Sequence, residues 1–384
     1  MTGALDGLLV ADFSRVLAGP YATMLLADLG ATVVKVERPG AGDDTRSWGP
    51  PFAADGQSTY FQSVNRNKRS IALDLRDEAD LRIARALADR ADVLVENHKP
   101  GSLARFALDY DAVRTANPSV VYCSISGFGS GRGADLPGYD LLVQAMGGLM
   151  SITGTTEPTK AGVAVVDVIT GLQASVGILA ALRHRDRTGV GQRIEVTLLA
   201  ALQSALVNQA SSVVGAGVVP GLLGNAHPSI APYEVFATVD RPLVLAVGND
   251  AQFARLVAVL GDPALADDVR FATNAARVVH RAELLEALES LLASAGADVW
   301  QARITAAGVP CGPINDIGQV FAEPQVIHRG MRIDLPHPTA GRVPGVKNPI
   351  NYSRTAIEYR DAPPLLGQHT DQVLEAELGL DSGE

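Results

Sequence analysis

Short apolar runs alternate with stretches of helical spacing through the first third of the chain. Residues 8–13 and 31–37 are nearly continuous apolar runs that predict buried strands, and residues 19–29 between them have the spacing of a helix that ends at Gly30. The alternation continues with a predicted helix over 78–90 and predicted strands over 91–97 and 119–125. Continuous apolar strands joined by helices are typical of a parallel sheet with both faces covered. We therefore expect a Rossmann-like α/β large domain with a mostly parallel sheet, whose ligands bind at the carboxyl ends of the strands.

The second half of the chain predicts a smaller α+β domain. Residues 233–239 and 242–247 have strand composition and flank a two-residue turn, which predicts a hairpin. Helices are expected over 252–260, 281–295 and 299–307. Segments rich in proline and glycine, 215–232 and 336–349, predict linkers. The predicted organisation is a large domain over 1–200, a linker over 201–224, a small domain over 225–325, a second linker over 326–345 and a C-terminal segment over 346–384.

One carboxylate, Asp167, interrupts an apolar run that begins at Gly162 and continues with helical spacing. Asp167 is therefore expected at or near a helix N-terminus, where aspartate most often serves as an N-cap. The other interpretation is a nucleophile, because a carboxylate is already ionised at neutral pH and needs no partner base. Small residues one turn further, Thr170, Gly171 and Ala174, would let a ligand approach closely. Spacing alone leaves both interpretations open.

Composition and charge narrow the class of protein. A chain of 384 residues that is 47% hydrophobic is long enough for two soluble globular domains. The formal net charge of −10 argues against non-specific binding to nucleic acid or to anionic membranes. We expect a cytoplasmic protein, because neither a signal peptide nor an uninterrupted apolar run of roughly 20 residues is visible. Cys123 and Cys311 have neither disulfide nor zinc spacing, so no metal is expected.

Basic residues and glycines follow the predicted strands, at the edge where a parallel sheet binds ligands. Neither GxGxxG nor GxxxxGK[ST] is present, so the usual nicotinamide and P-loop fingerprints are missing. The predicted helix that begins at Gly19-Pro20 has free N–H groups, and nearby guanidinium groups suit phosphate contacts. Taken one at a time, these basic residues are better explained as ordinary surface charge: Arg15, Arg38, Lys68, Arg69 and Arg105.

Six short motifs occur in one order along the chain. They are VLAGP at 16–20, KVERPG at 35–40, NRNKRS at 65–70, VENHKPG at 95–101, GFG at 127–129 and DVITG at 167–171. In this order they resemble the class III CoA-transferases, the CaiB/BaiF family, over nearly the whole chain. The resemblance implies transfer of coenzyme A from an acyl-CoA to a free carboxylic acid, with succinyl-CoA and a dicarboxylate as a candidate pair. It implies that Asp167 carries first an aspartyl anhydride and then an aspartyl-CoA thioester.

The resemblance also assigns positions that contact ligands. Those implied for CoA are Val16, Leu17, Ala18, Arg38, Lys68, Asn97 and Arg105. For the acceptor acid, the loop over 224–229 suggests His227 and Ser229, although a proline-containing turn explains the same residues. The resemblance further implies that the C-terminal segment returns to the large domain and that two chains interlock as a homodimer.

Departures from the family's branches restrict the activity. Leu17 stands where the formyl-CoA branch has glutamine, so formyl or oxalyl transfer is not expected. The α-methylacyl-CoA racemases have a histidine where this chain has Tyr139, so the acid and base pair needed on opposite faces of an α-carbon is incomplete. A racemase or epimerase of the same fold, and a non-catalytic acyl-CoA-binding protein, are the alternatives to a transferase.

Overall fold

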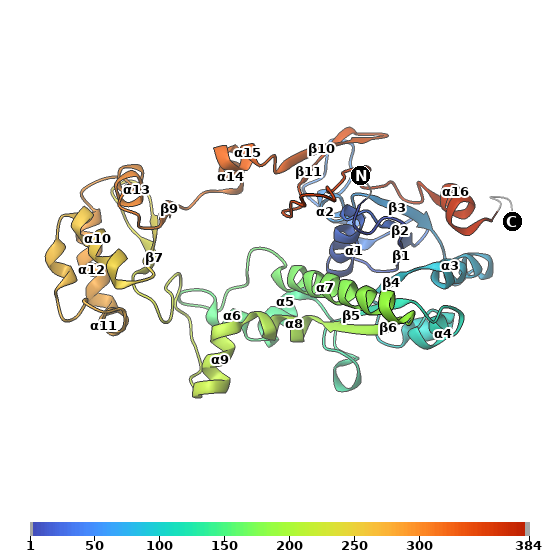
Figure 1. Ribbon diagram of the computed structural model, residues 1–384, viewed down its shortest axis with the longest axis horizontal. Helices are drawn as coiled ribbons and strands as arrows, with labels where there is room; N and C mark the ends of the chain where they lie inside the picture. Colours follow the sequence, from blue (N-terminus) through green and yellow to red (C-terminus); the bar gives the residue numbers. More distant parts are fainter. Residues whose placement is uncertain (1–2, 381–384) are drawn as a thin grey trace. The chain divides into compact units, whose positions relative to one another are not determined.

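A six-stranded parallel sheet organises the larger part of the computed structural model, which describes residues 3–380 (Figure 1). The strand order is β3-β2-β1-β4-β5-β6, and all neighbouring strands are parallel. The order reverses at β1, which lies between β2 and β4, so β1 marks the switch point where such sheets bind ligands. The strands are β1 Leu9–Asp12, β2 Thr32–Glu37, β3 Lys68–Ala72, β4 Val93–Glu96, β5 Val121–Ser126 and β6 Gln192–Thr197.

The strands predicted from apolar runs are confirmed as β1, β2, β4 and β5, with ends that differ by at most two residues. The remaining two strands were not predicted, because their sequences are polar. The β3 sequence begins Lys-Arg-Ser, and β6 alternates polar and apolar residues at the sheet edge. An isolated charge such as that of Lys68 argues against a buried strand unless its partner is known.

Helices cover both faces of the sheet (Figure 1). One face packs Val10, Val33 and Val121 against α1 and α7, and the other packs Ala11 and Leu94 against α3 and α4. The helices of this part are α1 Ala18–Asp28, α2 Thr59–Ser63, α3 Glu78–Arg90, α4 Tyr110–Ala116, α5 Asp140–Met146, α7 Val165–Thr188, α8 Leu198–Ala205, α9 Val207–Ala216 and α16 Thr370–Val373. Shorter turns of helix lie at Asp44–Ser47, Ser102–Phe106, Gly131–Gly133 and Leu374–Leu378.

The longest helix, α7, has the length and composition of a membrane span. So has the pair α8 and α9 taken together, although the pair is bent by 82°. Val166, Thr170, Ala174 and Ile178 of α7 recur at helical spacing and are buried, and α7 packs against α1, β5 and β6. The core helix of a soluble protein passes the same test, so α7 is weak support for a membrane location.

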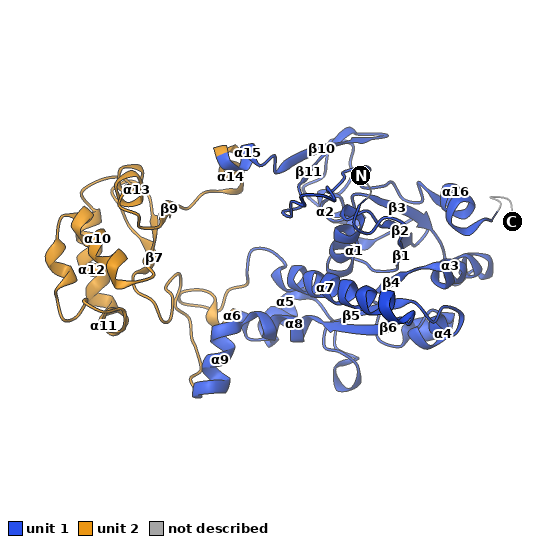
Figure 2. Ribbon diagram, in the orientation of Figure 1, with its two compact units in different colours: residues 1–149, 161–217, 325–384 blue, residues 150–160, 218–324 orange. Residues whose placement is uncertain are grey.

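The chain divides into two compact units (Figure 2). The first comprises residues 1–149, 161–217 and 325–384, and the second comprises residues 150–160 and 218–324. The second unit contains an antiparallel sheet in the order β7-β8-β9, which confirms the predicted hairpin as β7 and β8. Its strands and helices are β7 Tyr233–Phe236, β8 Leu243–Ala246, β9 Cys311–Pro313, α10 Asp250–Leu260, α11 Asn274–Val279, α12 Arg281–Leu292, α13 Ala297–Ala306 and α14 Ile317–Ala322, with a helical turn at Pro263–Ala266. At the unit borders lie α6 Leu149–Ile152 and α15 Pro324–His328.

Regular structure occupies much of the two segments predicted as linkers. Helix α9 lies inside 201–224, and the antiparallel strands β10 Arg332–His337 and β11 Gly341–Val346 occupy most of the second linker. The proline content of these segments led to the wrong prediction of irregular structure. Pro336 and Pro344 lie in a two-stranded sheet in which each strand has a free edge, where a missing backbone N–H is tolerated.

The C-terminal segment contacts the β3 region of the large sheet within the first unit. The backbone N–H of His369 donates to the carbonyl of Ser70 at 3.0 Å. Asn67 Oδ1 accepts the N–H of Arg360 at 2.8 Å and that of Asp361 at 3.0 Å. Val373 and Leu378 complete the core on the α3 face of the sheet.

Candidate active site

Helix α7 is capped by a side chain from another helix. Its N-cap residue, Ala164, has no side chain able to accept a hydrogen bond, so the first N–H groups of α7 need another acceptor. Asp140 Oδ1, at the start of α5, accepts the N–H of Val166 at 2.8 Å and that of Asp167 at 3.3 Å. Its Oδ2 accepts from Gln144 Nε2 at 2.6 Å. The N-cap interpretation of Asp167 is therefore wrong: Asp167 is the third residue of α7, and Asp140 does the capping.

The pKa of Asp167 is raised from 3.8 to about 7 by burial and, second, by the neighbouring charge of Asp140. A helix N-terminus favours a carboxylate, but here desolvation and the second carboxylate outweigh that effect. The expectation that Asp167 is fully ionised at neutral pH is thus corrected: the protonated and ionised forms are both present near pH 7. The ionised form is a more basic carboxylate than a solvated aspartate and hence a stronger nucleophile.

A cavity of about 390 Å³ lies beside Asp167, at the carboxyl ends of the strands. The loops after β1, β4 and β5 form its walls, as expected for ligand binding at a switch point. Tyr139 also lines it. The structure therefore brings together five of the residues singled out in the sequence: Val16, Leu17, Ala18, Asn97 and Asp167.

A second, smaller cavity of about 70 Å³ contains Arg38. Arg15 and His98 line both cavities, so the two adjoin at these side chains. The Arg38 side chain is 56% exposed and donates to Asp44 Oδ1 at 2.7 Å, while Arg15 donates to Asp44 Oδ2 at only 3.4 Å. Burial and the charge of Arg15 lower the pKa of His98 to about 4, so its ring is neutral at physiological pH. Arg15 thus lines the cavity that contains Asp167, and Arg38 lines the cavity that adjoins it.

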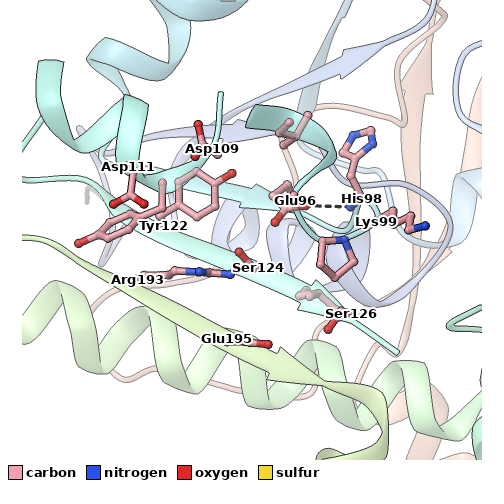
Figure 3. Close-up of a pocket in the computed structure, with 15 residues that line it drawn as sticks. Glu96, His98, Lys99, Asp109, Asp111, Tyr122, Ser124, Ser126, Arg193 and Glu195 are labelled. Atoms are coloured by element: carbon pink, nitrogen blue, oxygen red, sulfur yellow. Dashed lines mark hydrogen bonds between the residues drawn. The ribbon is translucent and has the colours of Figure 1, made fainter. Parts of the chain in front are cut away.

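A third cavity, of about 120 Å³, lies on the α4 side of the sheet (Figure 3). It shares five lining residues with the Asp167 cavity: His98, Lys99, Pro100, Ile125 and Ser126. Figure 3 shows Glu96 against the loop after β4, where its Oε2 accepts the N–H of His98 at 2.8 Å. Burial raises the pKa of Glu96. The lining contains more acidic than basic side chains: the acidic ones are Glu96, Asp109, Asp111 and Glu195, and the basic ones are Arg193 and Lys99.

The structure does not bring Lys68 or Arg105 to any of these three cavities. Lys68 is fully buried, and its ammonium donates to Asp12 Oδ2 at 3.0 Å, to Asn65 Oδ1 at 2.9 Å and to the carbonyl of Pro20 at 2.9 Å. With three acceptors and no exposed surface, Lys68 holds the core together instead of contacting a ligand. Arg105 is exposed and stacks on Phe106, 4.5 Å from the ring centre.

Buried charges around Lys68 form one network beneath the loop after β1. Burial lowers the pKa of Lys68 to about 8 against the opposing effect of Asp12. Burial raises the pKa of Asp12, but Lys68 and Lys35 outweigh it and lower the pKa overall. Lys35 is likewise fully buried and pairs with Asp43 at 2.9 Å. The basic residues near the site therefore divide into an exposed set and a structural set, which their spacing in the sequence does not separate.

His227 and Ser229 lie in the second unit and form a local turn. His227 Nδ1 accepts the N–H of Ser229 at 3.1 Å, and the imidazole packs edge-on against Tyr233 at 5.4 Å. Arg281 donates to the carbonyl of His227 at 2.6 Å, and Asn274 donates to that of Ser229 at 2.9 Å. The turn interpretation thus describes the loop, and a role in substrate recognition stays a prediction.

The small residues of α7 serve helix packing. A Cβ at Gly171 would lie 2.7 Å from the carbonyl oxygen of Ala18 and 3.1 Å from the ring of Tyr21. Helix α1 therefore approaches α7 at Gly171, one turn after Asp167, where the sequence analysis expected a ligand to approach. Sequence reasoning also missed Asp140, because its partner lies 27 residues away and no local motif connects the two.

A carboxylate of raised pKa lies in a cavity at the carboxyl edge of a parallel sheet, with Arg15 in its lining and Arg38 in an adjoining cavity. This arrangement suits a group-transfer enzyme that acts on a phosphate-bearing substrate. The family model for CoA-transferase family III matches residues 5–370, so the chain belongs to that family and is a CoA-transferase. The family uses acyl-CoA as a substrate. No group of three metal-ligating side chains occurs within residues 3–380.

Individual relatives agree with this assignment. The succinate–glutarate CoA-transferase of Agrobacterium fabrum is 49% identical over 97% of this chain and 95% of that protein. The succinyl-CoA:glutarate CoA-transferase of Mus musculus is 44% identical over 99% of this chain and 87% of that protein. A crystal structure of a CaiB/BaiF family protein from Brucella suis is 44% identical, with a TM-score of 0.88 over 98% of this chain and all of that chain.

Proposed function

We propose that the protein transfers coenzyme A from succinyl-CoA to a dicarboxylic acid such as glutarate, through covalent intermediates on Asp167. The observation that carries the proposal is the carboxylate of Asp167, half-buried and of raised pKa, in a cavity at the carboxyl edge of the sheet. The substrate pair is supported by the names of the relatives from Agrobacterium fabrum and Mus musculus, whose sequences match nearly the whole chain.

In the first half of the proposed reaction, a carboxylate oxygen of Asp167 attacks the thioester carbonyl carbon of succinyl-CoA. The C–S bond breaks, CoA leaves as a thiolate, and an aspartyl-succinyl anhydride remains. The thiolate then attacks the aspartyl carbonyl carbon of the anhydride, which releases succinate and leaves an aspartyl-CoA thioester. No proton is consumed in either step, so the ionised form of Asp167 is the reactive one.

In the second half, a carboxylate oxygen of the acceptor attacks the aspartyl thioester and again releases the thiolate. The thiolate attacks the acceptor carbonyl carbon of the new anhydride, which yields the acceptor's CoA thioester and restores Asp167. One thioester is consumed and one is formed, so the exchange needs neither ATP nor a metal. The walls of the cavity must exclude water while the anhydrides exist, because hydrolysis would waste them.

We assign CoA binding to the loops beside Asp167 and to exposed cations. Val16, Leu17 and Ala18 would line the pantetheine arm, and Asn97 would support this wall of the cavity. Arg38 would contact a phosphate in place of Asp44. For recognition of the acceptor acid we propose His227 and Ser229. Their replacement would raise KM for the acid and leave KM for succinyl-CoA unchanged. The cytoplasmic location and the interlocked homodimer stay predictions from the sequence.

Mass spectrometry after incubation with succinyl-CoA tests the proposed function. We expect a CoA adduct on the peptide that contains Asp167, removal of the adduct by glutarate, and no adduct in Asp167→Ala. Competition among dicarboxylic acids in the same assay ranks the acceptors. An Asp167→Ala variant that turns over like the wild type would overturn the assignment of the nucleophile.

The two alternatives give different results in the same experiment. A racemase would exchange the α-proton of its acyl-CoA with deuterated water without forming an adduct. A non-catalytic acyl-CoA-binding protein would bind CoA, form no adduct and leave the α-proton in place. Tyr139 lines the Asp167 cavity at the position where the racemases have histidine, and a phenol is a much weaker base at neutral pH.

A further inference from the structure

Val16 has a backbone conformation that valine rarely adopts. Its φ is +68°, in the left-handed region, where a β-branched side chain clashes with its own backbone. Val16 lies in the loop between β1 and α1, and it lines the cavity that contains Asp167. A strained residue at a functional site persists only when its surroundings hold it in place.

Two side chains hold the backbone on the N-terminal side of the strained Val16 torsion. Asn97 Oδ1 accepts the N–H of Arg15 at 2.8 Å, and Asn97 Nδ2 donates to the carbonyl of Arg15 at 2.7 Å. The carboxylate of Asp43 accepts the N–H of Val16 at 3.2 and 3.3 Å. Lys35, which pairs with Asp43, also donates to the carbonyl of Ser14 at 2.8 Å. Three consecutive residues, 14 to 16, are thus held by side chains from β2, from the loop after β2 and from the loop after β4.

The turn at Val16 determines where the next residues lie. Leu17 is buried against Val64 and Ala164, and Ala18 begins α1. The carbonyl of Ala18 is the atom that approaches Gly171 of α7. The left-handed turn therefore sets the cavity wall that faces the first turns of α7, where Asp167 lies.

We propose that Asn97 and Asp43 are positioning residues, which hold Val16 in its left-handed conformation and thereby fix the Leu17–Ala18 wall of the Asp167 cavity. The proposal rests on the proposed function in taking that cavity as the CoA site. It gives Asn97 a different role from direct contact with CoA, because its amide oxygen and nitrogen are already engaged by the backbone of Arg15.

The test measures Asn97→Ala in three backgrounds: the wild type, Val16→Ala and Val16→Gly. Glycine adopts the left-handed region freely, whereas alanine does not, so Val16→Ala is the control for loss of the valine side chain. Calorimetric titration with CoA gives Kd for each protein. We expect Asn97→Ala to weaken CoA binding about tenfold in the wild-type and Val16→Ala backgrounds, as for two lost hydrogen bonds. In the Val16→Gly background we expect CoA binding to weaken about threefold or less, because glycine adopts the left-handed turn without the hydrogen bonds from Asn97.

An equal loss in all three backgrounds would mean that Asn97 contacts CoA directly and would overturn the proposal. Hydrogen exchange of the amides of Arg15 and Val16 provides a readout that needs no ligand. Asn97→Ala should speed exchange in the wild-type background. Unchanged exchange there would contradict the positioning role of Asn97. If the wild type binds no CoA, the proposed function fails while hydrogen exchange still decides the positioning role. If Asn97→Ala does not fold, Asn97→Asp, which keeps the acceptor and loses the donor, is measured in the same backgrounds.

Discussion

Asp140 accepts the backbone N–H of Asp167 at 3.3 Å while its negative charge raises the pKa of the Asp167 carboxyl. One side chain thus performs two functions at the start of α7. The hydrogen bonds fix the helix end that carries Asp167, and the charge opposes ionisation of the group that the proposed reaction needs ionised. Burial is the larger cause of the raised pKa, so removal of the Asp140 charge lowers it only in part.

Asp140→Asn should shift the pH dependence of CoA exchange. In the wild type we expect the rate to rise with pH through a midpoint near 7, because the ionised Asp167 attacks. The variant keeps an acceptor for the Asp167 N–H but removes the charge, so the acidic limb should move to lower pH by about one unit. The measurement is kcat/KM for succinyl-CoA from pH 5 to pH 9.

Asp186→Asn is the matched control for this shift. Asp186 is exposed near the other end of α7, about 28 Å from Asp167 at the rise of a helix. Its removal should leave the acidic limb in place. An unchanged limb in Asp140→Asn, or an equal shift in both variants, would contradict the coupling between Asp140 and Asp167.

Asp167→Asn should abolish exchange and at the same time stabilise the protein at neutral and higher pH. Because the folded-state pKa is raised above 3.8, proton binding stabilises the wild type fully below about pH 4, and this contribution is lost as the pH rises to about 7. The asparagine of the variant does not ionise, so the variant does not lose stability as the pH rises. We expect it to be about 1–2 kcal/mol more stable than the wild type at pH 8, discounted for partial exposure, with a smaller difference at pH 5. Thermal unfolding at both pH values measures this, and a constant difference would show that the pKa is not raised.

Lys68→Met and Arg38→Ala should affect different properties. Lys68→Met leaves the carboxylate of Asp12 buried without its nearest cation, so the free energy of unfolding should fall by about 3–5 kcal/mol. Arg38 is exposed, so Arg38→Ala should weaken CoA binding about tenfold with little change in stability. Chemical denaturation and calorimetric titration with CoA separate the two. A Lys68→Met protein of normal stability that binds CoA weakly would restore the ligand-contact role implied by the resemblance.

Gly171→Ala should separate α1 from α7. The added Cβ would meet the backbone oxygen of Ala18 at 2.7 Å, and a backbone atom cannot move aside cheaply, so we expect a loss of about 1–3 kcal/mol together with lower exchange activity. Gly177→Ala on the same helix meets only the Ile194 side chain at 3.2 Å and gains helix propensity, so its stability should be equal or higher. Denaturation curves of both variants test this, and equal effects would refute the packing role of Gly171.

Much of the fold was predictable because it depends on local pattern. Apolar runs located β1, β2, β4 and β5, and strand and helix composition located the β7–β8 hairpin and several helices of the second unit. Asp167 was visible for the same reason, since one carboxylate in an apolar run stands out without any knowledge of its neighbours. The order of six motifs identified the family, which the comparisons confirm.

The sequence by itself determined where apolar and charged residues fall, and therefore the parallel sheet, the candidate nucleophile and the family. Only the tertiary structure decided what each charge does. It buried Lys68 against Asp12, 56 residues away, left Arg38 exposed, placed Asp140 over the start of α7 and made Gly171 a contact for α1. The physical reason is that burial and pairing depend on which distant segments meet, and a charged or small residue carries no local sign of the partner it will meet.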